Sequence, residues 1–275
     1  MSQAPANACA VFHALHEQGC FILPNPWDVG SARFLQSLGF KALATTSSGM
    51  AWSHGRPDGK AGLEAVLEHL RTMAAATDLP MNADFENGYA ADADEVARNV
   101  RQAAQTGVAG LSIEDGTGNP ADPLYPLDEA VARLQAARHA IDQAGTGTLL
   151  VGRAENFIVG RPDLDDTIAR LRAYARAGAD CLYAPGIRTR EQIATVVAAV
   201  APKPVNLLVG WSSELSLQEI ADLGVRRVSV GGALARTAWA GFMQAAQALA
   251  QGRFDAAFAH AASGDQLNKL FAAGR

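Results

Sequence analysis

Short apolar runs alternate along the chain with longer amphipathic stretches. In the stretch "GLEAVLEHLRTMAAAT", Leu63, Val66, Leu67 and Leu70 recur at the three-and-four spacing of one buried helical face. The apolar runs are four or five residues long and alternate little with polar residues, which is typical of strands in a parallel sheet covered on both faces. Eight runs are expected to be strands: Cys20–Pro24, Ala42–Thr46, Pro80–Asp84, Gly110–Glu114, Leu149–Arg153, Cys181–Ala184, Val205–Val209 and Arg227–Val230.

The alternation of strands and helices predicts a parallel sheet, and eight successive units predict a closed (β/α)8 barrel of the TIM type. An open doubly wound sheet would need a glycine-rich turn after its first strand, but "LPNPWDVGSA" contains no GxGxxG motif. Residues 1–275 are therefore expected to form a single barrel domain. Glycines suited to left-handed caps mark the ends of several predicted helices: Gly39, Gly107, Gly178 and Gly224.

The segment 233–275 follows the eighth strand and is too long for one closing helix. It is expected to form a C-terminal helical extension of two or three helices. Its apolar residues include Trp239, Phe242 and Met243, which could pack either on a neighbouring subunit or on the same barrel. The sequence leaves both alternatives open.

The composition is that of an ordinary globular protein, because the 275 residues are 49% hydrophobic and 19% charged. The net charge of −5 gives no reason to expect nucleic acid or an anionic membrane as a partner. Cys9, Cys20 and Cys181 are an odd number without a CxxC pair, so neither a disulfide framework nor a zinc site is expected. The N-terminus lacks the pattern of a signal peptide, and no run is long enough for a membrane span. We therefore expect a soluble, cytoplasmic protein.

Polar residues stand at the carboxyl end of nearly every predicted strand, where barrels of this type carry their chemistry. Because parallel strands in a barrel all end at the same rim, these side chains are expected to converge. They are Asn25, Asp28, Thr45, Thr46, Ser47, Ser48, Asp84, Glu86, Glu114, Asp115, Arg153, Glu155, Asn156, Tyr183 and Asn206.

Three carboxylates dominate this rim. Asp84 and Glu86 are two residues apart, so they point the same way from an extended backbone, and Glu114 arrives from the next strand. With no histidine or cysteine nearby, they form an all-oxygen site that suits Mg²⁺ or Mn²⁺ better than zinc. Arg153 on the following strand could hold a carboxylate of the substrate through two parallel hydrogen bonds.

Each of these residues also has an ordinary structural interpretation. Asn87 and Gly88 form a turn signal, so Asp84 and Glu86 could simply flank a solvated turn. Arg153 could be only the ion-pair partner of Glu114. The arrival of all these groups at successive strand ends favours the functional interpretation.

Four motifs in this order and spacing, "TSSGMAWSHGRPDG", "NADFENGY", "GLSIEDG" and "VGRAENF", resemble those of the isocitrate lyase / phosphoenolpyruvate mutase superfamily. The resemblance runs from about Asn25 to Gly232. It implies a (β/α)8 barrel, often with the last helix exchanged between subunits of a dimer, and assembly into tetramers. It also implies Mg²⁺ and a substrate that passes through an enolate of pyruvate or a related 2-oxo acid.

The resemblance also implies roles for the acidic residues. Asp84 matches the direct metal ligand of the family, Glu86 replaces the second Asp of its DxD motif, and Glu114 matches the Glu of its IED motif. The last two usually reach the metal through water. Asp58 in "GRPD" matches an Asp near the network of metal-bound water.

Substrate contacts are implied in the same way. Ser47, Ser48 and Gly49 match a loop whose backbone N–H groups bind the substrate carboxylate. Arg153 matches the substrate-binding Arg, and Asn206 matches a polar contact to the ligand in some members. Arg153, Asp58 and Glu114 are therefore the expected catalytic residues.

Two departures from the family pattern limit the assignment. Family lyases carry a K-[KR]-C-G-H type loop after strand four, whose Cys donates a proton to carbon, whereas this chain has "GTGNPADPLYP". Several members carry an acid or His after strand six, where this chain has Pro185 in "LYAPG". The chain thus resembles a branch without the lyase and mutase signatures.

The expected function is a Mg²⁺-dependent carbon–carbon lyase or decarboxylase acting on a small 2-oxo or 2-hydroxy di- or tricarboxylate. Without the loop Cys, the proton for the enolate carbon must come from water or from a residue such as Tyr125 or Tyr183. The alternatives are a phosphoenolpyruvate mutase-type or carbon–carbon hydrolase activity, and a 2-oxo acid binding protein without efficient turnover. The expected partner is a small carboxylate, and the chain is expected to form a homo-oligomer.

Overall fold

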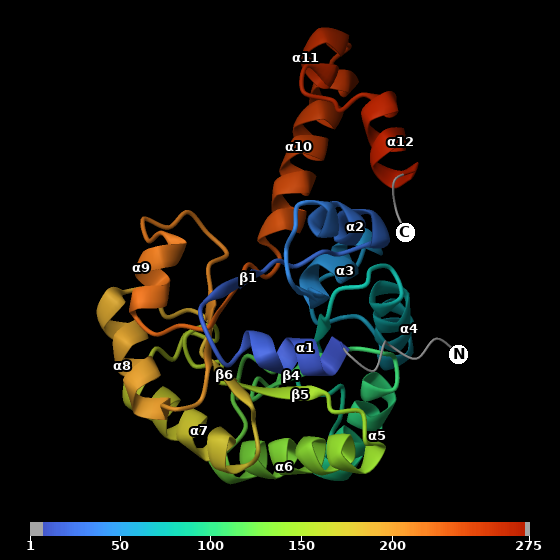
Figure 1. The fold of residues 1–275 in the computed structure, drawn as a ribbon. Coiled ribbons are helices and arrows are strands. Elements are labelled where there is room, and N and C mark those ends of the chain that lie inside the picture. The colour runs from blue at the N-terminus through green and yellow to red at the C-terminus, as the bar shows by residue number, and fades with distance from the viewer. Residues whose placement is uncertain (1–7, 273–275) are drawn as a thin grey trace.

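Eight parallel strands form a ring surrounded by helices in the computed structural model, which describes residues 8–272 (Figure 1). Each of the eight predicted strands is present, and most are shorter at one or both ends than the pattern predicted. The strands are β1 (Phe21–Leu23), β2 (Leu43–Ala44), β3 (Met81–Asp84), β4 (Gly110–Glu114), β5 (Leu149–Arg153), β6 (Cys181–Tyr183), β7 (Val205–Leu208) and β8 (Arg227–Ser229).

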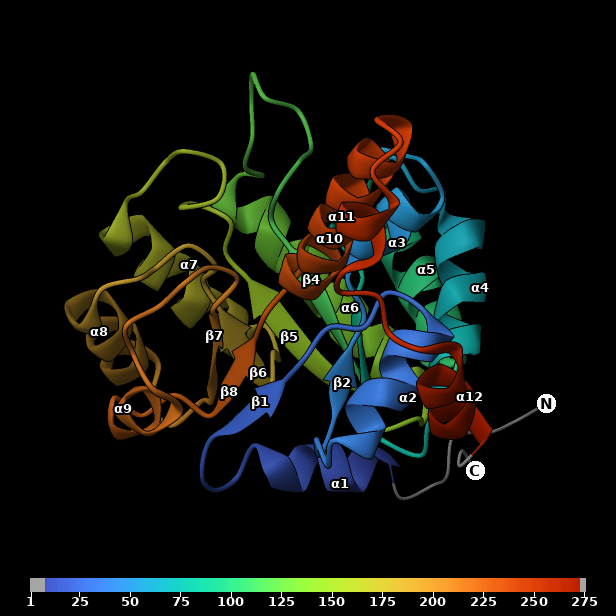
Figure 2. The same ribbon diagram turned by 90° about the horizontal axis from the view of Figure 1, so that it is seen from above.

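The helices surround the ring of strands, except for α1, which crosses one end of it (Figures 1 and 2). The last three helices form an arm (Figure 1). They are α1 (Ala8–Leu15), α2 (Val29–Ser37), α3 (Ser47–Ser53), α4 (Leu63–Ala74), α5 (Ala93–Ala104), α6 (Leu127–Ala144), α7 (Leu164–Arg176), α8 (Arg190–Val200), α9 (Leu217–Asp222), α10 (Ala233–Ala250), α11 (Phe254–Phe258) and α12 (Gly264–Ala272). The predicted (β/α)8 barrel with additional C-terminal helices is confirmed.

The strand order is β1-β8-β7-β6-β5-β4-β3-β2, so consecutive strands are neighbours and β8 returns to β1. One continuous row of paired residues joins Glu114, Arg153, Tyr183, Asn206 and Arg227 across β4 to β8. This register matters for the site, because it decides which side chains stand at the rim and which lie deeper.

The barrel closes between β1 and β2 without a regular ladder. One backbone hydrogen bond links Ala44 N–H to Pro24 O at 3.0 Å. The buried side chain of Asn25 completes the seam: its amide donates to Thr45 O at 2.9 Å, and its oxygen accepts from the N–H groups of Val230 and Gly231 at 2.9 Å each. Asn25 therefore ties the ends of β1, β2 and β8 together.

Helix α1 crosses the amino-terminal end of the barrel (Figure 2). Its Phe12 is fully buried and packs with Leu23, Leu149 and Val151 in a cluster separate from the larger core between sheet and outer helices. Gly110 allows this approach, since a Cβ at that position would lie 2.6 Å from the Phe12 ring. The barrel is thus closed at the end opposite the carboxyl ends of its strands.

The helix boundaries follow from local capping. Asp28, Thr189 and Ser216 each accept a hydrogen bond from the backbone three residues on, and each forms a reciprocal capping box. The four glycines expected to end helices all adopt positive φ angles, between 82° and 103°.

The arm formed by α10, α11 and α12 projects away from the barrel (Figure 1). Only Ala235 and Ala248 of α10 are buried, whereas Phe242 is 62% exposed and Phe254 is 65% exposed. The extension therefore does not bury its large apolar side chains on its own barrel. No helix among residues 8–272 has both the length and the apolar character needed to cross a membrane.

Replacing Asn25 by Ala is expected to lower the free energy of unfolding by about 2–3 kcal/mol, because three backbone groups would lose their partners at a buried position. Urea unfolding measures the change. Asn119→Ala is the matched control, since the exposed Asn119 side chain accepts, among residues 8–272, only the Ala121 N–H, and it is expected to shift the free energy by less than about 0.5 kcal/mol. Equal effects of the two changes would refute the proposed role of Asn25 at the seam.

Candidate active site

A cavity of about 610 Å³ opens at the carboxyl ends of the strands. The last residue of every strand lines it: Leu23, Ala44, Asp84, Glu114, Arg153, Tyr183, Leu208 and Ser229. The remaining wall comes from the connections that follow the strands, including Ser47, Ser48, Asp58 and Glu86. The structure therefore gathers most of the residues predicted to form the site.

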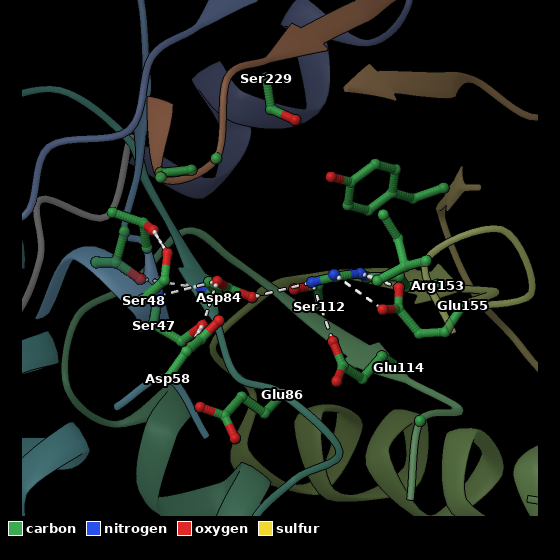
Figure 3. Close-up of a pocket in the computed structure, with 18 of the residues that line it drawn as sticks. Ser47, Ser48, Asp58, Asp84, Glu86, Ser112, Glu114, Arg153, Glu155 and Ser229 are labelled. Atoms are coloured by element: carbon green, nitrogen blue, oxygen red, sulfur yellow. Dashed lines mark hydrogen bonds and ion pairs between the residues drawn. The ribbon is translucent and has the colours of Figure 1, made fainter. Parts of the chain in front are cut away.

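Arg153 lies at the centre of the charged groups (Figure 3). Its Nε and Nη2 donate to the two carboxylate oxygens of Glu155, with 3.1 Å between Nη2 and Oε2. Its Nη1 lies 3.0 Å from Glu114 Oε2 and 3.3 Å from Asp84 Oδ1. Glu155 thus fixes the plane of the guanidinium, and Nη1 is directed to the acids on the opposite wall.

Glu155 is held in place by a second buried group. Its backbone N–H donates to Asp115 Oδ1 at 2.8 Å, and Asp115 Oδ2 accepts from Arg170 Nη1 at 3.0 Å and from the Tyr174 hydroxyl. The sequence placed Asp115 and Glu155 at the rim but gave them no role. The sequence signal for such a role was their position next to the predicted site residues: Asp115 follows Glu114 directly, and Glu155 comes two residues after Arg153.

Ser47 connects two of the acidic residues. Its backbone N–H and its hydroxyl each donate to Asp84 Oδ2 at 3.0 Å, and the hydroxyl lies 3.4 Å from Asp58 Oδ1 (Figure 3). Asp58 and Asp84 therefore share one donor at the wall of the cavity. Burial, with the nearby charge of Asp84, raises the pKa of Asp58.

Ser47, Ser48 and Gly49 open helix α3 rather than forming a loop. Gly49 N–H donates to the Thr46 hydroxyl at 3.3 Å, and Gly49 is buried outside the cavity lining. The Ser47 and Gly49 N–H groups thus already have partners within the protein. Ser48 lines the cavity, where its hydroxyl shares a hydrogen bond with Thr46 at 3.0 Å.

Glu86 follows β3 on a turn with left-handed backbone at two non-glycine residues, Glu86 (φ 44°) and Tyr89 (φ 51°). Such conformations are uncommon and often occur at functional sites. Burial raises the pKa of Glu86 to about 7, assisted by Asp84 and Asp58 and opposed by Tyr89 and Arg153. Its buried Oε1 finds no hydrogen-bond donor among residues 8–272.

Glu114 experiences the same environment. Burial raises the pKa of Glu114 above its ordinary value, although Arg153 opposes the rise, and the neighbouring acids add to it. Asp58, Asp84, Glu86, Glu114 and Glu155 all line a cavity in which Lys60, Arg153 and Arg227 are the lysine and arginine residues. The cavity is therefore deficient in positive charge.

A divalent cation fits this chemistry. Every candidate donor is a carboxylate, and the partnerless Glu86 oxygen is the observation that calls for a cation. The described part of the chain holds no group of three or more Asp, Glu, His or Cys side chains already arranged around a metal position. This suits an ion that keeps several waters and uses one or two carboxylates directly, as Mg²⁺ does.

Two predicted contacts lie elsewhere. Asn206 is fully buried below the rim and outside the cavity lining, where its amide donates to Ser229 Oγ at 2.9 Å. Tyr125 is also outside the lining, with the Arg133 guanidinium 4.2 Å from its ring centroid. Tyr183 does line the cavity, and burial raises its pKa to about 12, so its hydroxyl stays protonated at neutral pH.

The pKa of Glu86 predicts a specific pH effect in the presence of a chelator. The folded protein binds this proton more tightly than the unfolded chain, whose carboxyl has an ordinary pKa of about 4.3. The contribution of Glu86 to stability is thus greatest below that value and is lost as the pH rises toward about 7. Thermal melts should show that Tm falls more between pH 5 and pH 8 for the natural chain than for Glu86→Gln. Equal losses would contradict the assignment.

Comparison with known proteins agrees with this geometry. The profile of the family described as phosphoenolpyruvate phosphomutase matches residues 12–250. A crystal structure from Burkholderia cenocepacia, provisionally described as a lyase/mutase, is 48% identical to this chain, with a TM-score of 0.94. The match covers 98% of this chain and 97% of that chain. An oxaloacetate decarboxylase from Bradyrhizobium sp. is 34% identical over 215 residues, which are 74% of this chain and 70% of that protein.

A crystal structure of oxaloacetate acetylhydrolase with the product oxalate is 26% identical, with a TM-score of 0.85, over 98% of this chain and 95% of that chain. The predicted superfamily is thus confirmed, as is the prediction of an enzyme related to carbon–carbon lyases. With its barrel, its acidic rim and a family match over most of its length, the chain belongs to the phosphoenolpyruvate phosphomutase family.

Proposed function

We propose that this enzyme cleaves a carbon–carbon bond of a short 2-oxo dicarboxylate such as oxaloacetate, with Mg²⁺ or Mn²⁺ as cofactor. The observation that carries the proposal is the cavity in which Arg153 meets the acids of β3 and β4 beside Glu86, whose buried Oε1 has no donor among the described residues. Such a cavity can accept a cation and an anionic substrate together. Decarboxylation is the reaction that we favour.

The cation would be held directly by Asp84, with Glu86 and Glu114 reaching it through water. Asp84 lies between Ser47 and Arg153 at the end of β3, and Glu86 and Glu114 flank it. A bound divalent cation supplies Lewis-acid stabilisation of the negative charge on the 2-oxo oxygen.

Arg153 would bind the substrate carboxylate. Glu155 occupies Nε and one edge of Nη2, so the remaining donors are directed to the wall formed by Asp84 and Glu114. A guanidinium held in this way keeps its orientation during the reaction and stabilises developing negative charge without rearranging. The Ser48 hydroxyl, at the opposite wall, can donate to the same carboxylate.

Decarboxylation makes few demands on acid or base groups. The bond between C3 and the distal carboxylate breaks, its electron pair moves to C3 and the 2-oxo oxygen, and CO2 leaves. The resulting enolate then takes one proton at C3, from water or from the protonated Tyr183 hydroxyl. This agrees with the segment 116–126 after β4, whose residues in the cavity lining are Gly116, Thr117 and Gly118, none of them a general acid.

Hydrolytic cleavage is the second candidate, because oxaloacetate acetylhydrolase shares the fold over nearly the whole chain. It would require a water molecule to attack the 2-oxo carbon while a carboxylate such as Asp58 accepts its proton. The C2–C3 bond then breaks, leaving oxalate, and the departing C3 carbon takes a proton to give acetate. A mutase acting on a phosphorus–carbon bond and a 2-oxo acid binding protein without turnover are the remaining alternatives. The products distinguish all four.

We also propose a homo-oligomer, a dimer or tetramer that exchanges its last helices, working in the cytoplasm. The exposed Phe242 and Phe254 on the projecting arm support the assembly. The three free cysteines support the cytoplasmic location. Light scattering should give a multiple of the chain mass, reduced by Phe242→Glu. A monomeric natural chain would contradict the assembly.

The function is tested by supplying oxaloacetate to chelator-treated protein with and without Mg²⁺ or Mn²⁺. Enzyme-dependent pyruvate and CO2, above the metal-catalysed background, are expected for decarboxylation, and oxalate with acetate would identify hydrolysis. Asp84→Ala and Arg153→Lys should each lower kcat/KM by about 100-fold or more, because the first removes the carboxylate proposed to hold the cation and the second removes the planar guanidinium proposed to orient the substrate.

Arg71→Lys is the matched control, since the side chain of Arg71 pairs, within the described part of the chain, only with Glu68 on the exposed face of α4, and its activity should be unchanged. Turnover that persists in chelator and in Asp84→Ala would refute the metal-dependent mechanism. Interconversion of phosphoenolpyruvate and phosphonopyruvate, with stable oxaloacetate, would establish the mutase alternative.

A further inference from the structure

Arg227 is a buried guanidinium at the floor of the cavity. It is the first residue of β8, only 2% exposed, and it lines the same cavity as Arg153. The paired row from Arg153 through Tyr183 and Asn206 leads to it across the barrel wall. The reaction proposed above gives it no part.

Its described hydrogen-bond partners are all uncharged. Arg227 Nε donates to Asn206 Oδ1 at 2.7 Å, and Nη1 lies 3.4 Å from both Asn82 Oδ1 and His16 Nε2. The Phe12 ring lies beneath the guanidinium, 5.9 Å from its central carbon. Nη2 donates to none of the side chains that the structure describes.

No Asp or Glu in the range 8–272 forms an ion pair with Arg227. His16 does not supply the missing negative charge, and burial with the charge of Arg227 lowers its pKa to about 3, so it stays neutral. Burial also lowers the pKa of Arg227 itself, yet a guanidinium keeps its proton in proteins. Within residues 8–272, Arg227 is therefore a cation in the barrel interior without an ion-pair partner, which is costly.

We propose that Arg227 forms an anion-binding subsite at the floor of the cavity, which takes a small carboxylate or a small monovalent inorganic anion. Asn82 Oδ1 lies 3.4 Å from Arg227 Nη1, and Ser229 accepts from Asn206, the partner of Arg227 Nε, so neutral hydrogen-bonding groups surround the guanidinium. Asn82 and Ser229 also line the cavity.

The anion has two possible sources with the same chemistry. It is either the far carboxylate of the substrate, in which case the inference rests on the proposed function, or a free anion that binds alongside the substrate. In both cases the charge on Arg227 is balanced by a ligand rather than by the protein.

The test is a thermal-shift titration of the full-length protein with formate and chloride, with and without Mg²⁺. Ionic strength is kept constant with a bulky sulfonate buffer. The natural chain should show a saturable rise in Tm, because a ligand that binds only the folded state stabilises it. Arg227→Met should lose this rise, and its affinity for short dicarboxylates should fall at least tenfold if the substrate supplies the anion.

Arg226→Met is the matched control. Arg226 is adjacent in sequence and carries the same charge, but it donates to Gly19 O on the outside of the barrel. Its anion response should equal that of the natural chain. The inference is overturned if the natural chain shows no saturable shift, or if Arg227→Met responds as the natural chain does.

Asn206→Asp provides a second, nearly isosteric test should Arg227→Met fold poorly. It places a carboxylate against Arg227 Nε, so it should raise Tm without added anion and abolish the response to formate. An unchanged response in Asn206→Asp would also overturn the inference.

Competition identifies the source of the anion. A dicarboxylate that displaces formate indicates the substrate carboxylate, and simultaneous binding indicates a free anion; both outcomes support the subsite. Because the thermal shift needs no turnover, an inactive protein with the anion response would refute only the proposed function. An active protein without the response would refute only the subsite.

Discussion

The arrangement of the active site depends on how one guanidinium is shared among acids. Arg153 binds Glu155 on one edge and meets Glu114 and Asp84 with its Nη1. If Arg153 were removed, the three acids would remain buried without its compensating charge, which typically costs several kcal/mol at buried ion pairs. The strand ends β3, β4 and β5 are therefore linked electrostatically as well as by their backbone ladder. Asp115, Arg170 and Tyr174 extend this linkage from the rim to helix α7.

Much of the fold could be predicted from the sequence because its signals are local. The apolar runs and the helical spacing of residues such as Leu63 and Leu67 each depend on neighbours within a few positions. The convergence of Asp84, Glu114 and Arg153 was also predictable, since parallel strands in a barrel end at one rim. The barrel and the convergence of most acidic residues at its rim could thus be predicted from the sequence.

What the sequence did not reveal depends on register and on geometry in three dimensions. Asn206 was assigned to the substrate, but the pairing of β7 with β8 places it against Arg227, and Leu208 lines the cavity instead. Ser47 and Gly49 were expected to offer free N–H groups, and the start of α3 gives those groups partners. The fork between Glu155 and Arg153 and the isolation of Arg227 involve contacts that no linear pattern encodes.

Every strand contributes its final residue to the cavity wall, and the segments beyond those residues complete it. The last residue of each strand thus belongs both to the hydrogen-bonded ring and to the cavity wall. Insertions or substitutions after the last strand residues can reshape the cavity entrance without disturbing strand pairing or the packing of Phe12 at the opposite end. A barrel built in this way can acquire new substrates through its outer segments while the inner ring keeps its thermodynamic stability.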